Sequence, residues 1–553
     1  NAKDSLKQNA LYHLADCYLK TNQKQEARNA FFSASQLNAN ADIKETALFS
    51  YAKLSFELGF DNDAIKNLQD FIVAYPKSKN NVAAYSLLSQ VFEFTQNYSK
   101  ALEVLEQVGG NKIPELSESV QRVAYLRGVE LFNERKFDQA IEHFNKSLAA
   151  AQEPSYTALA HFWTADAYYR QAKYNNAINH ANRYLATAGG RAQSDKVNPA
   201  SARYTLGYAL FKQQKYADAF SHFEAVTDAL ANNSNTQPVI APLYPDALLR
   251  SGDCQFMQRN YKSAANFYNA VINKSLPGTD YAYFQKSMIA GLTGFPEEKI
   301  SGMKSLIKNY ANSYYTDDAM YQIGLTQISI NQGNQAISTL EELLKKYPQS
   351  DYAPKAIANI ALTNFNLNNL DAALFNYERI MKQYPKSPQA NDAVMGIRDV
   401  YAARGDAQGY INYMQQYPDF AISTNAQDTL SYEIAESYYN KGDCTSAIKE
   451  FTDYLHLFQQ GAFALYAHFY RGQCLYSREL YDQARTDYDY VIAQKGNPFM
   501  EQALDKGGRI ALYIDKNYAK AHGLFEQLLN QTTRKELVIE ALRGLILNNT
   551  HSS

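Results

Sequence analysis

DYAPKAIANIALTNFNLNNLDAALFNYERIMKQYPKS, residues 351–387, nearly repeats the 37 residues that precede it, 314–350. The equivalent pairs are Tyr315 and Tyr352, Ala319 and Ala356, Ile323 and Ile360, Leu325 and Leu362, Ala336 and Ala373, and Tyr347 and Tyr384, the last two each followed by proline. Self-similarity at a fixed period of 20 to 50 residues is the signature of a stacked-repeat protein. One unit has been copied, and the chain is expected to be built from it.

The unit consists of two apolar blocks at helical spacing, 356–365 and 372–380, separated by the polar turn 366–369. Each block predicts one short amphipathic helix. Pro354 suits a first helical turn, where its missing N–H would have no partner in any case. Pro385 ends the second helix, because proline cannot continue it. The unit is therefore predicted to be a helical hairpin.

Small residues mark where the two helices cross closely, at Ala361 and Ala373, while Tyr377 and Ile380 fill the space beside them. This pattern, closed by Pro385, resembles the tetratricopeptide repeat (TPR). The family unit is about 34 residues. The longer unit here, ending in Tyr-Pro-(Lys/Gln)-Ser, resembles the variant in outer-membrane assembly lipoproteins of the BamD type and periplasmic coordinators of the YbgF type. The resemblance implies an all-α, right-handed TPR solenoid, or superhelix.

The small residue of the second helix recurs along the whole chain and is used here as a marker. The markers are Ala27, Ala64, Ala101, Ala140, Ala177, Ala219, Ala264, Lys299, Ala336, Ala373, Gly409, Ala447, Ala484 and Ala521. They predict about fourteen hairpins, and 536–547 reads as the first helix of a further, partial one. We expect one continuous solenoid over 1–553, with N-terminal repeats in 1–185, repeats with long connections in 186–245, central repeats in 246–418 and C-terminal repeats, truncated at the end, in 419–553.

Two further features share this register. A small residue twelve positions before the marker appears as Ala15, Ala52, Ser89, Gly128, Ala165, Gly207, Gly252, Gly324, Ala361, Ala435 and Gly472. Glycine within a helix costs up to about 1 kcal/mol relative to alanine, so close helix crossing is the expected reason. An aromatic residue three positions before the marker is expected to wedge between the helices of a hairpin, at Tyr98, Phe137, Tyr174, Tyr216, Tyr261, Tyr481 and Tyr518.

Four segments depart from the pattern. The connections 186–199 and 229–245 carry helix-breaking Gly, Asn, Ser and Pro and are expected to be loops, either as added contact surface or through neutral drift. The units 287–313, with Lys299 as marker, and 390–418, with Gly405 and Gly409, are degenerate. Their weaker interhelix packing predicts local bending and early opening, since such arrays are stabilised by nearest neighbours.

Composition excludes several functions. There are 54 basic and 56 acidic residues, a net charge of −2, which supplies no field for holding nucleic acid. No apolar run reaches the roughly 20 residues of a membrane span. Cys17, Cys254, Cys444 and Cys474 are too far apart in sequence to suggest local bridges and are expected to be buried thiols. The 44 tyrosines, with many Asn and Lys, resemble a Bacteroidetes composition.

Chemical motifs are missing from the sequence. It contains no phosphate loop, dinucleotide fingerprint, HExxH, GxSxG or EF-hand loop. The nine histidines include no pair at helical ligand spacing, and His456 and His468 fall in different predicted helices. Acid pairs such as Glu433 with Glu436 and Glu341 with Glu342 are expected to be solvated helix edges. We therefore expect no enzyme, no cofactor and no metal site.

In the TPR family the first helices line a concave groove, and this resemblance implies a partner-binding face. The fifth and twelfth positions of the first helices are largely aromatic, and a peptide track suits them because aromatic rings give large contact area for few rotatable bonds. The alternative is that each ring is core between hairpins. The implied groove residues are Tyr125, Phe162, Tyr169, Tyr204, Phe211, Tyr321, Phe365, Tyr432, Tyr439, Phe469 and Tyr476.

A carboxylate clamp of the kind found in some family members is incomplete. Lys355 and Asn359 occupy plausible positions, but the neighbouring hairpin offers Asp318 and Gln322. An adaptor for chaperone tails is therefore disfavoured.

The resulting hypothesis is a non-catalytic scaffold that binds protein or peptide partners along an aromatic groove in cell-envelope assembly. The resemblance implies the periplasm, with an outer-membrane anchor as one option and the cytoplasm as the alternative. A component of a type IX-like secretion apparatus is the runner-up. The recruiting or regulatory part of a larger enzyme or signalling protein is a second class, and glycan binding by the aromatic face is a third. We expect the parent protein to extend past both ends of this chain.

Overall fold

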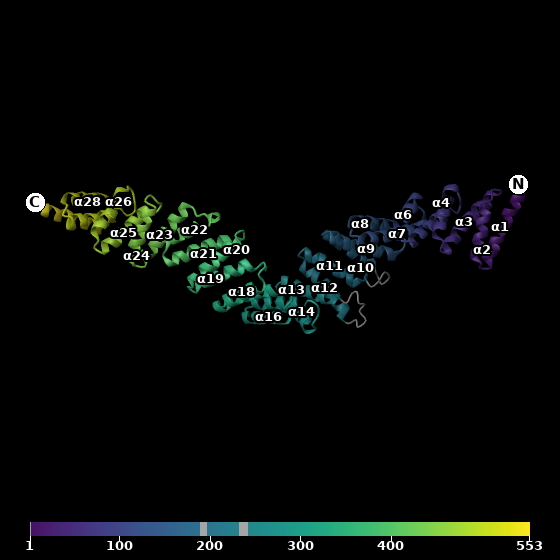
Figure 1. Cartoon of the computed structure of the whole chain (residues 1–553), viewed down its shortest axis with the longest axis horizontal. Helices are drawn as coiled ribbons and strands as arrows, with labels where there is room; N and C mark the ends of the chain where they lie inside the picture. Colours follow the sequence, from purple (N-terminus) through teal and green to yellow (C-terminus); the bar gives the residue numbers. More distant parts are fainter. Residues whose placement is uncertain (1, 188–195, 232–241, 553) are drawn as a thin grey trace. The chain divides into compact units, whose positions relative to one another are not determined.

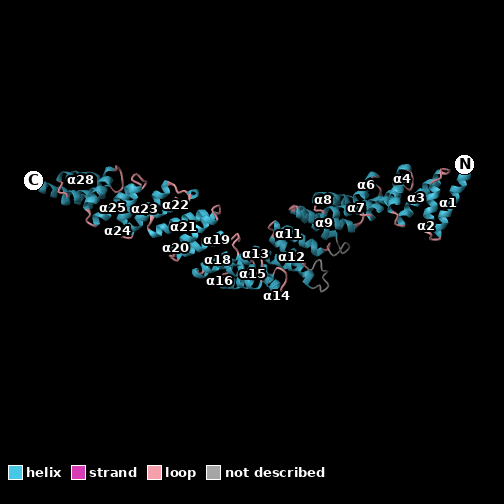
Figure 2. Ribbon diagram, in the orientation of Figure 1, coloured by secondary structure: helices cyan, strands magenta, loops and turns pink. Residues whose placement is uncertain are grey.

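The computed structural model describes residues 2–187, 196–231 and 242–552. Over these residues the protein contains 29 α-helices and no strand (Figures 1 and 2). The predicted all-α fold is confirmed. Among the described helices, none combines the length and apolarity that crossing a bilayer requires.

The chain divides into two compact units, residues 1–302 and 303–553. The helices of the first unit are α1 (Ala2–Lys20), α2 (Lys24–Ser35), α3 (Ala41–Glu57), α4 (Asp61–Ala74), α5 (Asn81–Phe94), α6 (Tyr98–Gln107), α7 (Pro114–Asn133), α8 (Phe137–Ala149), α9 (Pro154–Arg170), α10 (Tyr174–Thr187), α11 (Pro199–Lys212), α12 (Tyr216–Ala231), α13 (Leu243–Met257), α14 (Tyr261–Asn273), α15 (Thr279–Leu292) and the start of α16 (Pro296–Asn309).

The second unit continues from α16 in the same alternation. Its helices are α17 (Thr316–Ser329), α18 (Gly333–Lys346), α19 (Ala353–Asn366), α20 (Leu370–Gln383), α21 (Pro388–Arg404), α22 (Ala407–Met414), α23 (Thr424–Asn440), α24 (Cys444–Leu457), α25 (Ala464–Ser477), α26 (Tyr481–Ala493), α27 (Met500–Arg509), α28 (Tyr518–Gln531) and α29 (Lys535–Ser552). Short 3-10 helices lie at Gly110–Lys112 and Pro418–Phe420, and a π-helix at Ile510–Ile514.

Consecutive helices pair into hairpins, α1 with α2 through α27 with α28, and α29 follows alone. The predicted fourteen hairpins and the extra helix are therefore confirmed. Every alanine marker is buried, with at most 1% of its surface exposed, as at Ala373 and Ala177. Alanine is required there because a larger side chain would push the helices apart.

The first helix of most hairpins ends in the same way. In hairpin 4, Lys136 N–H donates to the Leu131 carbonyl at 2.9 Å, and Arg135 N–H to the Phe132 carbonyl at 2.9 Å. These are the two bonds of a Schellman cap. Arg135 is left-handed, with φ 62°, and many of the other hairpins also place a residue other than glycine at this site. The cap turns the chain within three residues, which is why the hairpin period is so regular.

Close packing explains the glycines of the first helices. A Cβ on Gly128 would lie 2.5 Å from the Phe144 ring, and one on Gly324 would lie 2.5 Å from Leu340. In hairpin 14 the equivalent residue is Gly508, where a Cβ would lie 2.8 Å from Phe525. It stands thirteen rather than twelve residues before Ala521, and the π-helix between them accounts for the extra residue because its turn is wider.

The two degenerate hairpins differ from each other. Lys299 is half-buried at its marker position, and burial lowers the pKa of its ammonium. The boundary between the compact units falls in the same helix, α16. In hairpin 11 the prediction that Gly409 is the marker is wrong. Gly409 instead donates its N–H to the capping Asp406 carboxylate at 2.7 Å, and the small residue buried in α22 is Ala407.

The predicted connections 186–199 and 229–245 coincide largely with residues 188–195 and 232–241, which lie outside the described residues. The described parts show that α12 extends to Ala231 and that α13 begins at Leu243, ahead of Pro245.

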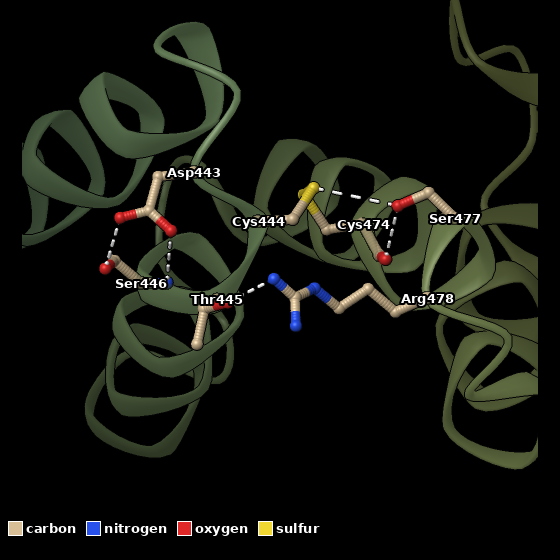
Figure 3. The surroundings of a disulfide bond; sticks show 7 residues. All are labelled: Asp443, Cys444, Thr445, Ser446, Cys474, Ser477 and Arg478. Carbon is tan, nitrogen blue, oxygen red and sulfur yellow. Dashed lines mark hydrogen bonds between the residues drawn. A yellow bond between two sulfur atoms is a disulfide. The ribbon is translucent and has the colours of Figure 1, made fainter.

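A disulfide joins Cys444, the first residue of α24, to Cys474 in α25, with the Cα atoms 5.2 Å apart (Figure 3). The bond therefore links hairpin 12 to hairpin 13. Beside it, Arg478 donates a hydrogen bond to Thr445, a second contact between the same two hairpins. The prediction of unbridged thiols is wrong here, because stacking brings together residues that are 30 positions apart in sequence. Of the other two cysteines, Cys254 is a buried thiol as predicted, whereas Cys17 is exposed.

Candidate functional site

The first-helix face comprises the second, fifth, ninth, twelfth and thirteenth positions of the first helices, counted with the small residue as the eighth. Its twelfth-position rings pack at the hairpin turns, against the aromatic residue that opens the second helix. The ring pairs are Phe132–Phe137 at 5.4 Å, Tyr169–Tyr174 at 6.0 Å, Phe211–Tyr216 at 5.3 Å, Phe256–Tyr261 at 5.7 Å and Tyr476–Tyr481 at 5.5 Å. The aromatic wedge is confirmed in these five hairpins. Tyr169, Phe211 and Tyr476 keep a half-exposed edge, as does Phe365.

The fifth-position rings are more deeply placed. Phe162, Tyr321, Tyr432 and Phe469 expose less than a tenth of their surface and pack between hairpins. Little of these four side chains is left for a partner to touch. Tyr125 is half-buried, and burial raises the pKa of its phenol to about 12.

In the first unit the fifth position also belongs to a polar network. Tyr204 and Tyr208 of α11 both donate to the Asp246 carboxylate of α13, at 2.7 and 2.5 Å. Arg250, one turn further along α13, lies 3.5 Å from Asp246. Burial is the largest cause that raises the pKa of Tyr204 and of Tyr208, and the carboxylate adds to it. Hairpins 6 and 7 are thus joined by neutral phenols bonded to a carboxylate.

Arg250 extends this network toward hairpin 8 by pairing with Asp253. The buried Asp253 carboxylate also accepts hydrogen bonds from Tyr268 at 2.6 Å and from Tyr281 of α15 at 2.9 Å. Burial raises the pKa of Asp253, while Arg250 and the two phenols oppose the rise. The sequence reasoning found Tyr204 but missed Tyr208, Asp246 and Arg250. The signal was present, since Tyr208 and Asp246 occupy ninth and second positions of adjacent first helices.

In the second unit, rings on the first-helix face and directly beside it form a set called here the C-terminal aromatic cluster. Its members are Tyr432, Tyr439, Phe463, Tyr466, Phe469, Tyr470 and Phe499. Two parallel stacks hold it together, Tyr432 on Phe463 at 4.5 Å and Phe469 on Phe499 at 4.0 Å. Phe463 and Phe499 precede α25 and α27, so the loops between hairpins supply half of each stack.

The outer members of this cluster remain accessible. Tyr466 exposes 38% of its surface and packs edge-on against Phe499 at 5.1 Å. Tyr439 and Tyr470 are half-buried, with their rings 4.6 Å apart. The arrangement offers rigid rings with phenolic hydroxyls at the surface, which suits contact with an extended peptide. Sequence reasoning identified Tyr439 but missed Tyr466 and Tyr470, because their accessibility depends on the loop phenylalanines.

The remaining candidates form local contacts. Asn359 donates to the Tyr321 hydroxyl at 3.2 Å, and the Lys355 ammonium lies 5.5 Å from the centre of the Tyr352 ring. Both groups of the incomplete clamp are therefore engaged within the protein. The acid pairs behave as helix edges: Glu342 pairs with Lys346, and Glu436 accepts from Tyr432.

Histidines lie closer together than the sequence suggested. His161 of α9 and His180 of α10 have their Nδ1 atoms 3.1 Å apart. Burial lowers the pKa of His161 to about 4, and it also lowers the pKa of His180. The described residues contain no group of three or more His, Cys, Asp or Glu side chains arranged to hold a metal ion.

Models of known protein families match most of these hairpins. Tetratricopeptide repeat families match residues 125–195, 204–278 and 432–498, and another matches 9–31. The outer-membrane lipoprotein family YfiO matches residues 314–406, which include the repeated stretch 351–387. With the fourteen hairpins, these matches make the chain a tetratricopeptide repeat protein.

Individual relatives are distant. The DnaJ homolog subfamily C member 7 homolog of Dictyostelium discoideum is 26% identical over 190 residues, which are 34% of this chain and 32% of that protein. The chain thus matches about a third of the length of this curated relative. Similar solved structures include YrrB, a TPR protein with an unusual peptide-binding site, which has 15% identity, covers 40% of this chain and 96% of its own, and has a TM-score of 0.31.

Two other solved structures are similar at the same level. A tetratricopeptide repeat protein from Parabacteroides merdae has 13% identity, covers 55% of this chain and 98% of its own, and has a TM-score of 0.26. A Naa15/Naa10 complex bound to HypK matches at 12% identity, covering 100% of this chain and 87% of its own, with a TM-score of 0.30.

Proposed function

We propose that this protein is a non-catalytic scaffold of the cell envelope that binds protein or peptide partners on its first-helix face. TPR folds generally mediate protein–protein interaction, and a tetratricopeptide repeat family matches residues 125–195, 204–278 and 432–498. The observation that carries the proposal is the C-terminal aromatic cluster. There, the partly exposed rings of Tyr439, Tyr466 and Tyr470 pack against buried aromatic rings that are stacked on one another.

The cluster has the properties of a binding hot spot. Tyrosine is enriched among the residues that dominate binding energy, since it buries a large area and also forms a hydrogen bond. The stacks of Tyr432 on Phe463 and Phe469 on Phe499 hold the outer rings in place before a partner arrives. Such preorganisation favours affinity because little side-chain freedom remains to be lost.

Two observations support the periplasm, with or without an outer-membrane anchor. Disulfides persist in oxidising compartments and are rare in the cytosol, and Cys444 and Cys474 form one here. The YfiO match over residues 314–406 adds a resemblance to outer-membrane lipoproteins.

The binding proposal is tested by affinity capture from an envelope fraction, comparing the wild-type chain with the triple variant Tyr439→Ala, Tyr466→Ala and Tyr470→Ala. These three side chains are half-buried or exposed, so their truncation leaves the stacked base in place. We expect recovery of the major partner to fall at least about tenfold, since hot-spot residues contribute roughly 1 to 2 kcal/mol or more each.

The matched control is Phe375→Ala, which removes an aromatic ring that is 63% exposed on the second helix α20. Its yield should equal that of the wild type. Equal recovery by the triple variant and the wild type would exclude the cluster as the binding site.

A second candidate is the recruiting or regulatory part of a larger protein. The Dictyostelium relative favours this candidate, because the match spans only 32% of that protein and the rest of it lies outside the matched repeats. A type IX-like secretion component is the alternative within the envelope class. Cell fractionation of the native protein separates the classes: an envelope location supports the scaffold, whereas a cytosolic location with free thiols at positions 444 and 474 supports the recruiting role.

A further inference from the structure

A polar hollow of about 1120 Å³ lies in the second unit, away from the aromatic cluster. Its walls come from α24 and α26, the second helices of hairpins 12 and 13, and α25 contributes His468 and Arg471 between them. His468 is two residues from both Tyr466 and Tyr470. At 3.6 residues per turn it therefore lies on the opposite side of α25 from the aromatic cluster.

Below the hollow lies a fully buried carboxylate, Asp487 of α26. It accepts three hydrogen bonds, from His468 Nδ1 at 2.7 Å, Arg471 Nε at 2.9 Å and Arg471 Nη2 at 2.6 Å. Arg471 Nη1 donates to Thr452 at 3.1 Å. A guanidinium carries five N–H donors, so two remain for a ligand, and 17% of the Arg471 side chain is exposed. Asp487 thus fixes a cation at the base of an open site.

The rest of the lining adds positive and amide groups. Lys495 and His456 are exposed on opposite walls, and the amides of Gln459, Gln460 and Gln494 stand along the rim. Of the described residues that line the hollow, none is acidic. The negative charge of Asp487 is already balanced by Arg471, which leaves the exposed Lys495 ammonium to favour an anionic ligand, and the imidazole of His456 can donate a hydrogen bond to it.

Hydrogen bonds to neighbouring side chains and backbone groups hold the loops at both rims of the hollow. On one side, the buried Asp428 accepts from Ala462 N–H at 2.7 Å and from the Tyr454 hydroxyl at 2.5 Å. On the other, Asn497 donates to the Val491 carbonyl at 2.9 Å and accepts from Phe499 N–H at 2.9 Å. The loops that form the rims are therefore ordered without a ligand, as expected of a binding site that is largely preformed.

We propose that this hollow binds an acidic segment of a polypeptide, with an Asp or Glu carboxylate on Arg471 and the main chain along the glutamine rim. A planar guanidinium matches the planar carboxylate through two parallel hydrogen bonds. Glutamine side chains carry both a donor and an acceptor, so they can pair with the N–H and C=O groups of an extended peptide. The site is independent of the aromatic cluster and would make the array a two-sided binder.

The test is calorimetric titration of the whole chain with the peptide acetyl-Gly-Glu-Glu-Glu-Glu-Gly-amide and with its analogue in which Gln replaces each Glu. We expect heat of binding from the first peptide only, and weaker binding as salt increases. Arg471→Gln should raise the Kd at least about tenfold, since it removes a charged group at a desolvated contact. The triple tyrosine variant should bind this peptide as the wild type does, which separates this site from the proposed function.

Arg471→Gln leaves Asp487 with fewer partners and could disturb folding, so a surface variant is tested beside it. His456→Gln with Lys495→Gln changes two exposed side chains and should raise the Kd about threefold to tenfold. Lys441→Gln removes an equal charge from an exposed lysine outside the hollow and should leave the Kd unchanged. The proposal is overturned if the acidic peptide gives no heat, if both peptides bind equally, if the surface variant binds as the wild type does, or if polygalacturonate binds more tightly than the peptide.

Discussion

Hairpins 10 and 13, both in the second unit, share one register but contain opposite chemistry. In hairpin 10 the fourth and seventh positions of the first helix are Ile357 and Ile360, exposed by 0% and 1%. In hairpin 13 the same positions are His468 and Arg471, and the residue facing them from the second helix is Asp487. One hairpin is a close-packed apolar core, and the other is the base of a polar hollow.

The difference shows what the repeat demands and what it leaves open. Both hairpins keep the small residue of each helix, Ala361 and Ala373 in one and Gly472 and Ala484 in the other, all buried. The positions between them can hold charged residues only when all the hydrogen-bonding partners are present together. A buried carboxylate is tolerated when its hydrogen bonds are satisfied. A single polar substitution in the apolar hairpin has no such partners.

The largest effect is expected from Ile360→Asp, which places one charge in the apolar hairpin. We expect a loss of about 4 to 5 kcal/mol, since an unpaired buried charge is among the most destabilising changes. Hydrogen exchange of the α19 and α20 amides measures it locally, as a long repeat array need not unfold in a single step. Leu362→Asp on the same helix, at a side chain 50% exposed, is the control and should change stability by less than about 0.5 kcal/mol.

The disulfide adds a covalent tie that joins hairpin 13 to hairpin 12. Cys444→Ser should lower stability by about 3.5 kcal/mol for a 30-residue loop, on the loop-entropy estimate. Chemical denaturation with and without reductant measures the loss, and Cys17→Ser, which changes an exposed free thiol, is the control. Thiol titration of the unfolded, unreduced chain should find two free cysteines, and a result of four would refute the bridge.

Asp487→Asn should cost about 3 kcal/mol, because it leaves Arg471 and His468 without their shared anion. The cost is smaller than that of Ile360→Asp because the partially exposed Arg471 can turn toward water. Hydrogen exchange in α25 and α26 is the measurement. The triple change Asp487→Asn, Arg471→Ile and His468→Ile, which gives α25 the two isoleucines of hairpin 10, should recover part of the loss. No recovery would contradict the view that only the complete set matters.

Hairpin 5 is a third version of the same register, with His161 at the fourth position and His180 in place of Asp487. Both imidazole pKa values are lowered, so the folded state binds fewer protons than the unfolded chain. The stability from this pair is present above pH 6.5 and is lost as the pH falls toward about 4. The loss between pH 7.5 and 4.5 is about 2.5 kcal/mol. Denaturation midpoints from pH 7.5 to 4.5 test this, with His161→Leu expected to flatten the profile and the exposed His13→Leu expected to leave it unchanged.

The smallest effect concerns the turns of the two hairpins. Asn368 in hairpin 10 and Glu479 in hairpin 13 are both left-handed, with φ of 60° and 61°. Asparagine adopts this conformation more readily than glutamate. Glu479→Asn should therefore gain about 0.5 kcal/mol and Asn368→Glu should lose a similar amount. Thermal unfolding of the two variants checks the opposite signs, and a shift in the same direction would show that the turns are not equivalent.

Most of the fold could be read from the sequence because its cause is local. A buried alanine at a fixed interval, as at Ala336 and Ala373, reports the crossing of two helices that are neighbours in the chain. The sequence pattern is lost or misleading where a local change alters the register. In hairpin 14 the π-helix inserts one residue after Gly508, and in hairpin 11 the capping role of Gly409 imitates a packing glycine.

Less of the candidate site could be predicted. The implied groove included Tyr432 and Phe469, which are buried, and omitted Tyr466 and Tyr470, which are accessible. The reason is that the phenylalanines on the connecting loops cover some rings and leave others open. A periodic sequence pattern does not contain this information.

The repeat period by itself determined that the chain is an array of fourteen α-hairpins with aromatic turns, because each hairpin is specified by residues within about 37 positions of one another. Only the tertiary structure decided which rings reach the surface, that Cys444 meets Cys474, and that Asp487 supports a polar hollow. Those features depend on how one hairpin stacks on the next. Stacking combines two copies of the pattern with the loops between them, and small differences between copies then determine the chemistry at each junction.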